Sequence, residues 1–102
     1  MKKIVEELKD YTIPLTAFRK YIEQVLNLEP DKFMKEAPNA IIIPHLINFL
    51  EKRYEIDFLD AIFYTNANTN QKPIQYNELV KKTIRVCFYK IQFEQDLMFI
   101  PF

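Results

Sequence analysis

The fold class depends on one stretch of the sequence, Ile84-Arg85-Val86-Cys87-Phe88-Tyr89. Its β-branched and aromatic residues are typical of a β-strand, but a strand would be apolar on both faces and would place Arg85 on one of them. On a helix of 3.6 residues per turn, the polar residues around this stretch instead gather within about 100°. The pattern therefore predicts a helix over residues 78–95, capped by Asn77, and leaves a strand within 83–93 as the alternative.

The clearest helical pattern lies further upstream, in residues 15–28. Apolar side chains fill one continuous half of the helical wheel and polar side chains fill the other, without a misplaced residue. Thr12 and Pro14, just before this segment, are typical of a helix start. We therefore predict an amphipathic helix that buries one face.

Shorter helices are predicted in the rest of the chain. They cover residues 2–10, one or two turns within 31–37, residues 44–54 and a segment that Asp57 caps. The apolar members of this last segment are Phe58, Leu59, Ile62 and Phe63. The β-branched residues 40–43 are ambiguous, because Pro44 favours an extended conformation in the residue before it. Residues 65–76 are rich in asparagine and predict a surface loop.

The complete absence of glycine supports a helical fold. Glycine is the usual residue in tight hairpin turns and in loops that bind phosphate. Its absence therefore argues against a compact β-barrel, a Walker-type NTPase and a Rossmann domain, whereas helices can end on asparagine instead. With 102 residues, of which 49% are hydrophobic, the chain is expected to form one all-α domain over residues 1–102. We expect a bundle of four to five helices with a long, largely buried C-terminal helix.

Cysteine usage and hydropathy predict a cytoplasmic protein without a membrane partner. Cys87 is the only cysteine, so the sequence excludes an internal disulfide framework and a cysteine-rich metal site. The N-terminus lacks the pattern of a signal peptide. The longest uncharged run, residues 37–50, is too short to span a bilayer.

The candidate catalytic groups do not combine into a site. The chain has no serine and one histidine, His45, while Cys87 lies in an apolar stripe of the predicted C-terminal helix. The carboxylates of the central region are Glu51, Glu55, Asp57 and Asp60. Helix capping and a solvated surface explain them. We therefore expect no enzymatic activity, no cofactor and no bound metal ion.

A basic face on the predicted C-terminal helix is a candidate binding site. It holds Lys81, Lys82 and Arg85, with Tyr89 one turn further on. Such a face can contact the phosphates of a nucleic acid or an acidic patch on a protein. The chain has 14 basic and 14 acidic residues and thus lacks the positive excess that supplies much of the affinity for DNA. Nucleic acid is therefore the less favoured partner.

A second apolar stripe on the same helix suggests a protein interface. A helix that is apolar on two sides is either enclosed by its neighbours or presents one side to another chain. The candidate interface residues, which include part of the apolar C-terminal run, are Phe93, Leu97, Phe99 and Phe102. Packing within the domain is the favoured interpretation, and a homodimer or partner surface is the alternative.

Together these observations favour a small non-enzymatic protein-binding module. An adaptor, an immunity-type protein or a phage-borne inhibitor of a host enzyme would fit, acting by occlusion or allosteric capture. The many isoleucines and lysines suggest a bacterial or phage source. The alternative function is a nucleic-acid-associated regulator that uses the basic face.

Overall fold

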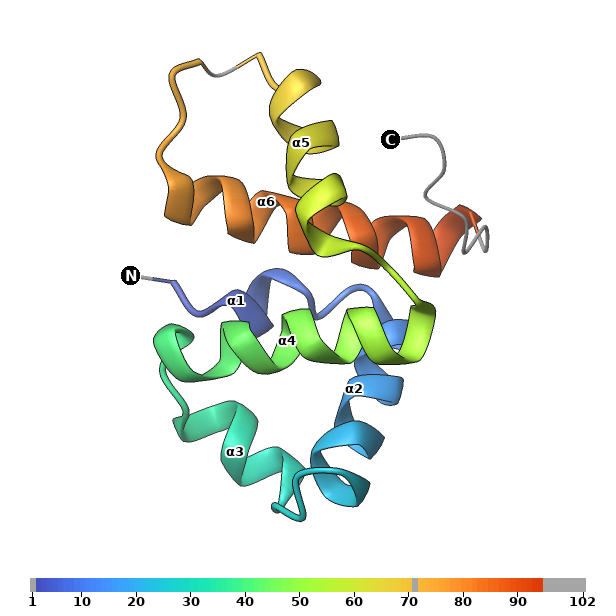
Figure 1. The fold of residues 1–102 in the computed structure, drawn as a ribbon. Helices are drawn as coiled ribbons and strands as arrows, with labels where there is room; N and C mark the ends of the chain where they lie inside the picture. Colours follow the sequence, from blue (N-terminus) through green and yellow to red (C-terminus); the bar gives the residue numbers. More distant parts are fainter. Residues whose placement is uncertain (1, 71, 95–102) are drawn as a thin grey trace.

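Helices supply the regular structure of the chain (Figure 1). The computed structural model describes residues 2–70 and 72–94, and no strand occurs within them. The segments are α1 (Ile4–Glu7), α2 (Thr12–Gln24), α3 (Pro30–Glu36), α4 (Asn39–Tyr54), α5 (Phe58–Ala67), α6 (Tyr76–Tyr89) and the π-helical turn η1 (Lys90–Glu94). The all-α prediction is confirmed. The described part contains six α-helices, counting the short α3, where four to five were predicted. None of these helices combines the length and apolar character needed to cross a bilayer.

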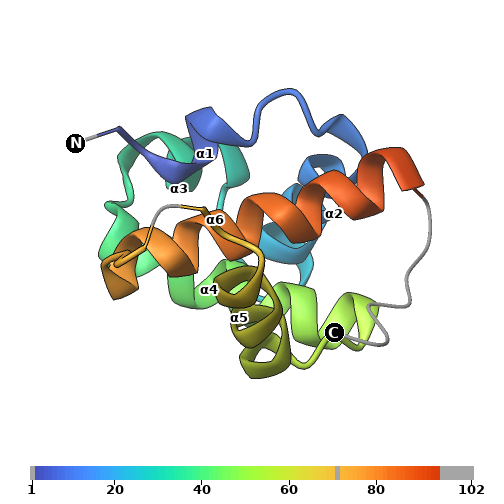
Figure 2. The ribbon, with the colours of Figure 1, turned by 90° about the horizontal axis from the view of Figure 1, so that it is seen from above.

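The C-terminal helix α6 lies at the centre of the molecule. α5 packs on one side of it and α4 on the other, while its continuation η1 packs against α2 (Figures 1 and 2). The buried residues of α6 and η1 are Leu79, Val80, Lys81, Thr83, Ile84, Cys87, Phe88 and Ile91. The predicted helix is therefore confirmed within 83–93. Its strand-like composition follows from its position, because a helix with neighbours on several sides is apolar around much of its circumference.

The ring of Phe49 connects three helices of the core. It is fully buried, and its centroid lies 5.2 Å from that of Phe18 on α2 and 6.3 Å from that of Phe88 on α6. Tyr21 and Tyr54 flank it, each with a centroid distance of 5.6 Å. Aromatic pairs in such arrangements contribute about 0.5–1.5 kcal/mol beyond the burial of their area. The aromatic cluster therefore holds α2, α4 and α6 together.

Helix α4 begins earlier than the proline pattern predicts. It takes in the ambiguous β-branched residues, and Pro44 lies inside it. A proline in a helix interior costs about 3 kcal/mol, but the earlier start buries Ile42 completely. The side chain of Asn39 accepts a hydrogen bond from the amide of Ile4 at 2.9 Å and donates one to the carbonyl of Lys2 at 3.1 Å. Burial and these two bonds offset the unfavourable proline.

Helix α2 ends at Gln24, four residues before the end of the amphipathic pattern. Asn27 then adopts a left-handed conformation with φ of 57°, which asparagine tolerates better than most residues. The chain turns into α3, where the carboxylate of Glu29 accepts hydrogen bonds from two amides of the first turn. Val25 and Leu28, which the wheel placed on the buried face, are therefore exposed.

Three other helix starts differ from the prediction. α1 is a single turn rather than a helix over 2–10. The residues before α2 and α6 are Tyr11 and Gln75, without a side-chain capping bond, whereas Thr12 and Asn77 were the predicted caps. In the first turn of α2, the amide of Ile13 donates instead to the Oε1 of Gln92. Asn77 is exposed, so water can satisfy the first amides of α6.

Helix α5 is capped as predicted but runs further than expected. Asp57 accepts hydrogen bonds from two amides of the first turn. The helix continues to Ala67, so the connection to α6 begins later than the predicted loop, and Thr69 within it is buried. Leu59 and Phe63, which were expected to be apolar contact residues, are largely exposed.

Replacing Phe49 tests its central position. We expect Phe49→Ala to lower the free energy of unfolding by about 3–5 kcal/mol, because it leaves a cavity among three helices. Phe63→Ala is the matched control, since this side chain is 63% exposed, and it should change the stability by less than about 0.5 kcal/mol. Urea denaturation followed by circular dichroism measures both variants. Similar losses in the two variants would contradict the role assigned to Phe49.

Candidate functional site

The two lysines of the predicted basic face lie against neighbouring segments. Lys81 is buried, and its Nζ lies 3.0 Å from the Oε1 of Glu78. The Nζ of Lys82 donates a hydrogen bond to the Oγ1 of Thr69 at 2.8 Å. This side of the helix is therefore less open than the wheel predicts.

The third cation, Arg85, pairs with the N-terminal helix. Its Nη1 lies 2.8 Å from the Oε1 of Glu7 on α1, and both side chains are at least two-thirds buried. A buried pair is screened by salt less than an exposed one. Of the four predicted contact residues, Tyr89 alone is exposed. A phosphate group would therefore have to compete with carboxylates of the chain itself for Lys81 and Arg85.

Tyr89 and Phe93 belong to an aromatic patch, which consists of Tyr11, Ile13, Tyr89 and Phe93. Phe93 is 59% exposed, and Ile13 and Tyr89 are about half exposed. The ring of Tyr11 meets the rings of Tyr89 and Phe93 edge-on, with centroid distances of 6.4 and 6.0 Å. The centroids of Tyr89 and Phe93 are 5.0 Å apart. Such contacts hold the rings in a defined arrangement.

The aromatic patch forms where the start of α2 meets the end of α6 (Figure 2). The amide of Ile13 donates a hydrogen bond to the Oε1 of Gln92 at 2.7 Å, across 79 sequence positions. A helical wheel compares residues of a single helix, so it offers no signal for Tyr11 or Ile13. Their contribution could be found only from the packing of η1 on α2.

The predicted apolar interface is only partly within the described residues. Phe93 is exposed, as an interface residue should be. Leu97, Phe99 and Phe102 lie outside the described residues. Along the second apolar stripe, Leu79 is buried while Phe93 is open to solvent. The stripe therefore turns outward towards its C-terminal end.

A groove between α2 and α4 adjoins the aromatic patch. It has a volume of about 370 Å³ and includes Ile13, which it shares with the patch. Its aromatic residues are Tyr21, Phe49 and Tyr54, and its charged residues are Lys20 and Arg53. Burial raises the pKa of the Tyr54 hydroxyl, although the Arg53 charge opposes the shift. The tyrosine therefore stays neutral at neutral pH, and the charge of the groove is positive.

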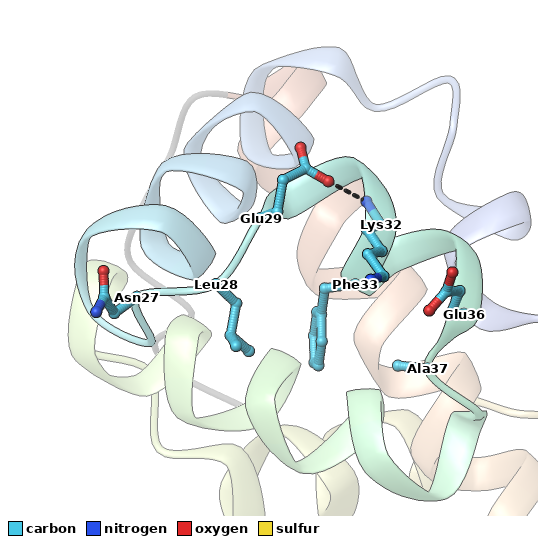
Figure 3. A pocket seen from close by; sticks show the side chains of 7 residues that line it. All are labelled: Asn27, Leu28, Glu29, Lys32, Phe33, Glu36 and Ala37. Atoms are coloured by element: carbon cyan, nitrogen blue, oxygen red, sulfur yellow. Dashed lines mark hydrogen bonds between the residues drawn. The ribbon is translucent and has the colours of Figure 1, made fainter.

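A second hollow lies beside α3 (Figure 3). It has a volume of about 510 Å³, and the side chains of Leu28 and Phe33 point into it. Its charged residues, Glu29, Lys32 and Glu36, have both signs. The carboxylate of Glu29 is already bonded to the amide of Lys32 as part of the helix cap. The hollow thus combines apolar surface with charges of both signs.

Two of the central carboxylates, Glu51 and Asp57, accept hydrogen bonds at the start of α5, and the other two, Glu55 and Asp60, are exposed. Besides Asp57, the Oε2 of Glu51 accepts a hydrogen bond from the amide of Phe58 at 3.3 Å. His45 packs edge-on against Phe33, with a centroid distance of 5.7 Å. Within 2–70 and 72–94, no three side chains of histidine, cysteine, aspartate and glutamate are placed to hold a metal ion.

Cys87 is enclosed in the core. It has no exposed surface, and burial raises the pKa of its thiol to about 12, with a smaller opposing effect of the Lys90 charge. The thiolate is the nucleophilic form of cysteine. The thiol therefore stays protonated and inaccessible at neutral pH.

This raised pKa predicts a loss of stability in alkaline solution. Above its ordinary pKa of about 8.5, the thiol of the unfolded chain ionises while the folded protein keeps its proton. The unfolded state then binds fewer protons, so the free energy of unfolding falls as the pH rises, by at most about 1.4 kcal/mol per pH unit. Urea denaturation between about pH 8 and 11 should show a shallower fall for Cys87→Ala than for the wild type. Equal slopes would contradict the raised pKa.

The Arg85–Glu7 pair predicts an energetic coupling between α6 and α1. We expect Arg85→Gln and Glu7→Gln each to lower the free energy of unfolding. The double variant should lose less than the sum, with a coupling of about 1 kcal/mol. A coupling indistinguishable from zero in urea denaturation would mean that the pair does not stabilise the fold.

Comparison with known proteins assigns the chain to no family. No protein-family model, no curated protein and no solved structure matches the chain. Its function therefore has to be inferred from the contacts, exposure and charge of its own residues.

Proposed function

We propose that this protein is a small non-enzymatic binding module that engages another protein through the aromatic patch. The observation that carries the proposal is the exposure of Ile13, Tyr89 and Phe93 on two segments that touch each other. Exposed apolar patches mark interaction sites, and aromatic residues are enriched in the cores of protein interfaces. An adaptor, an immunity-type protein or a phage-borne inhibitor of a host enzyme would use such a patch by occlusion or allosteric capture.

The arrangement of the patch supports a binding role because little of it needs to be ordered on association. The ring of Tyr11 packs against both Tyr89 and Phe93, and Ile13 is tied to Gln92 through its amide. Ordering side chains at an interface costs about 0.5–1.5 kcal/mol for each one immobilised. Rings that already contact one another avoid part of that cost.

The charge distribution favours a protein over a nucleic acid as the partner. Lys81 and Arg85 face Glu78 and Glu7, so the basic face has little free charge to release counterions from a phosphate backbone. A single buried cysteine suits a reducing compartment such as the cytoplasm. The same aromatic patch could join two copies of the chain about a two-fold axis, which makes a homodimer one form of this proposal.

Replacing Phe93 tests the proposal. We expect Phe93→Asp to remove stoichiometric capture of a protein from a lysate of the source organism, because a charge at the centre of an apolar interface must be desolvated. Tyr76→Asp is the matched control: Tyr76 is 66% exposed at the opposite end of the same helix. It should bind like the wild type. Circular dichroism establishes that both variants remain folded.

Nuclease treatment and mass measurement distinguish the outcomes. A captured protein that survives nuclease and depends on Phe93 supports the proposal. So does a dimer, found by light scattering, that Phe93→Asp dissociates. Recovery that requires intact DNA or RNA, or equal capture by Phe93→Asp and the wild type, would overturn it.

A further inference from the structure

The groove between α2 and α4 continues the aromatic patch along the surface. Ile13 belongs to both: it lines the groove, and its amide donates a hydrogen bond to Gln92, the residue before Phe93. Beyond Ile13, the apolar floor of the groove is formed by the partly buried Tyr21 and the exposed Val25. The buried ring of Phe49 supports this floor, with its centroid 5.6 Å from those of Tyr21 and Tyr54. Phe49 is a member of the core, so the floor is rigid. A partner that covers the aromatic patch would therefore meet a preformed apolar channel beside it.

The charge of this groove points to an acidic occupant. Among the described residues that line it, Lys20 and Arg53 are the charged ones, and no carboxylate is present. Both side chains are exposed, and no ion pair within the described part of the chain involves them. In contrast, Arg19 and Arg85, the other arginines, are each paired with a carboxylate. Positive charge in the groove is therefore left for a ligand.

Arg53 is placed to receive a carboxylate. Its guanidinium lies over the ring of Tyr54, 5.1 Å from the centroid. A guanidinium stacked in this way keeps the N–H groups at its edge available, and these can bind a carboxylate through two parallel hydrogen bonds. The stacking also reduces the rotamer freedom that would be lost on binding. Lys20 adds a second positive charge along the groove.

The length of the groove suits a short helix. It follows α2 from Ile13 to Val25, which corresponds to about 18 Å of helix axis. An amphipathic helix lays its apolar face into such a groove with anchors at positions i, i+3 or i+4, and i+7. The volume of about 370 Å³ is at the lower end for small-molecule pockets, which are mostly enclosed. Side chains of a peptide fit this open shape better than a whole small ligand.

We propose that the groove between α2 and α4 binds an acidic amphipathic helix of the partner protein. Its apolar side chains lie on Ile13, Tyr21 and Val25, and its carboxylates pair with Arg53 and Lys20. This inference rests on the proposed function, because it assumes that the partner is a protein.

Peptide selection tests the inference without knowledge of the partner. A displayed library of random peptides of about 16 residues, long enough to follow the groove as a helix, is selected on the full chain. We expect the enriched peptides to carry net negative charge and apolar residues at helical spacing. Their affinity should fall at least about tenfold for Lys20→Glu/Arg53→Glu, the loss expected when an interfacial charge pair is reversed.

Two further variants keep the result interpretable. Lys32→Glu/Lys35→Glu makes the same change in net charge on exposed lysines of α3 and should retain the affinity of the wild type. Lys20→Gln/Arg53→Gln removes both positive charges without introducing negative ones, and it should also weaken binding. Weaker binding by this milder variant would show that the loss in Lys20→Glu/Arg53→Glu does not come from a folding defect. Circular dichroism of each variant checks the fold.

The outcomes separate this inference from the proposed function. Enriched peptides that are neutral or basic, or equal binding by the wild type and Lys20→Glu/Arg53→Glu, would overturn the acidic helix. If the native partner still depends on Phe93 but is indifferent to Lys20→Glu/Arg53→Glu, the proposed function stands and the inference fails. If the wild type is a dimer and Lys20→Glu/Arg53→Glu is a monomer, the groove binds a second copy of the chain. This result would also overturn the inference of an acidic helix.

Discussion

The aromatic contact around Phe49 is the constraint on which both the fold and the candidate surface depend. Its ring lies against Phe18 of α2 and Phe88 of α6, so one side chain of α4 sets the spacing of three helices. The same ring reaches the floor of the groove beside Tyr21 and Tyr54. Because protein interiors are close-packed, a change in this contact would move the walls of the groove together with the core. Stability and the shape of the binding surface are therefore linked.

Because the chain has no glycine, its tight turns place other residues in an unfavourable backbone conformation. Asn27 and Glu55 adopt left-handed conformations with φ of 57° and 56°, and for a residue with a Cβ atom this costs roughly 1–2 kcal/mol. Prolines and carboxylates supply the helix starts instead, with Pro30 opening α3 and Asp57 capping α5. The turn at Glu55 comes directly after Arg53 and Tyr54. The end of α4 that bounds the groove is thus held in place by a sharp turn.

Charge pairing divides the surface into two kinds of region. On α6, cations meet carboxylates of the same chain, as in the pairs of Lys81 with Glu78 and Arg85 with Glu7. The groove, in contrast, contains Lys20 and Arg53 and no carboxylate among the described residues that line it. A zero net charge therefore does not mean an even charge distribution. The part of the surface with unpaired positive charge adjoins the part with exposed aromatic rings, and this combination supports a protein as the partner.

The sequence by itself determined the elements, because helical periodicity and capping act over a few residues. The amphipathic pattern of α2, the cap at Asp57 and the helix over the strand-like stretch that includes Cys87 all follow from local spacing. Helix ends were less predictable. The burial of Ile42 extended α4 through Pro44, and this burial depends on residues that are distant in the sequence.

Only the tertiary structure decided which surfaces are open. The wheel of α6 placed Lys81 and Arg85 on a polar face, but Lys81 is buried and Arg85 pairs with Glu7 of α1. A helical wheel also could not place Ile13 beside the end of α6, because the hydrogen bond from its amide to Gln92 joins residues 79 positions apart. The sequence thus determined which faces are apolar or charged, since this follows from the identity and spacing of side chains within each helix. Packing decided which of those faces remain available, because burial depends on how distant helices meet.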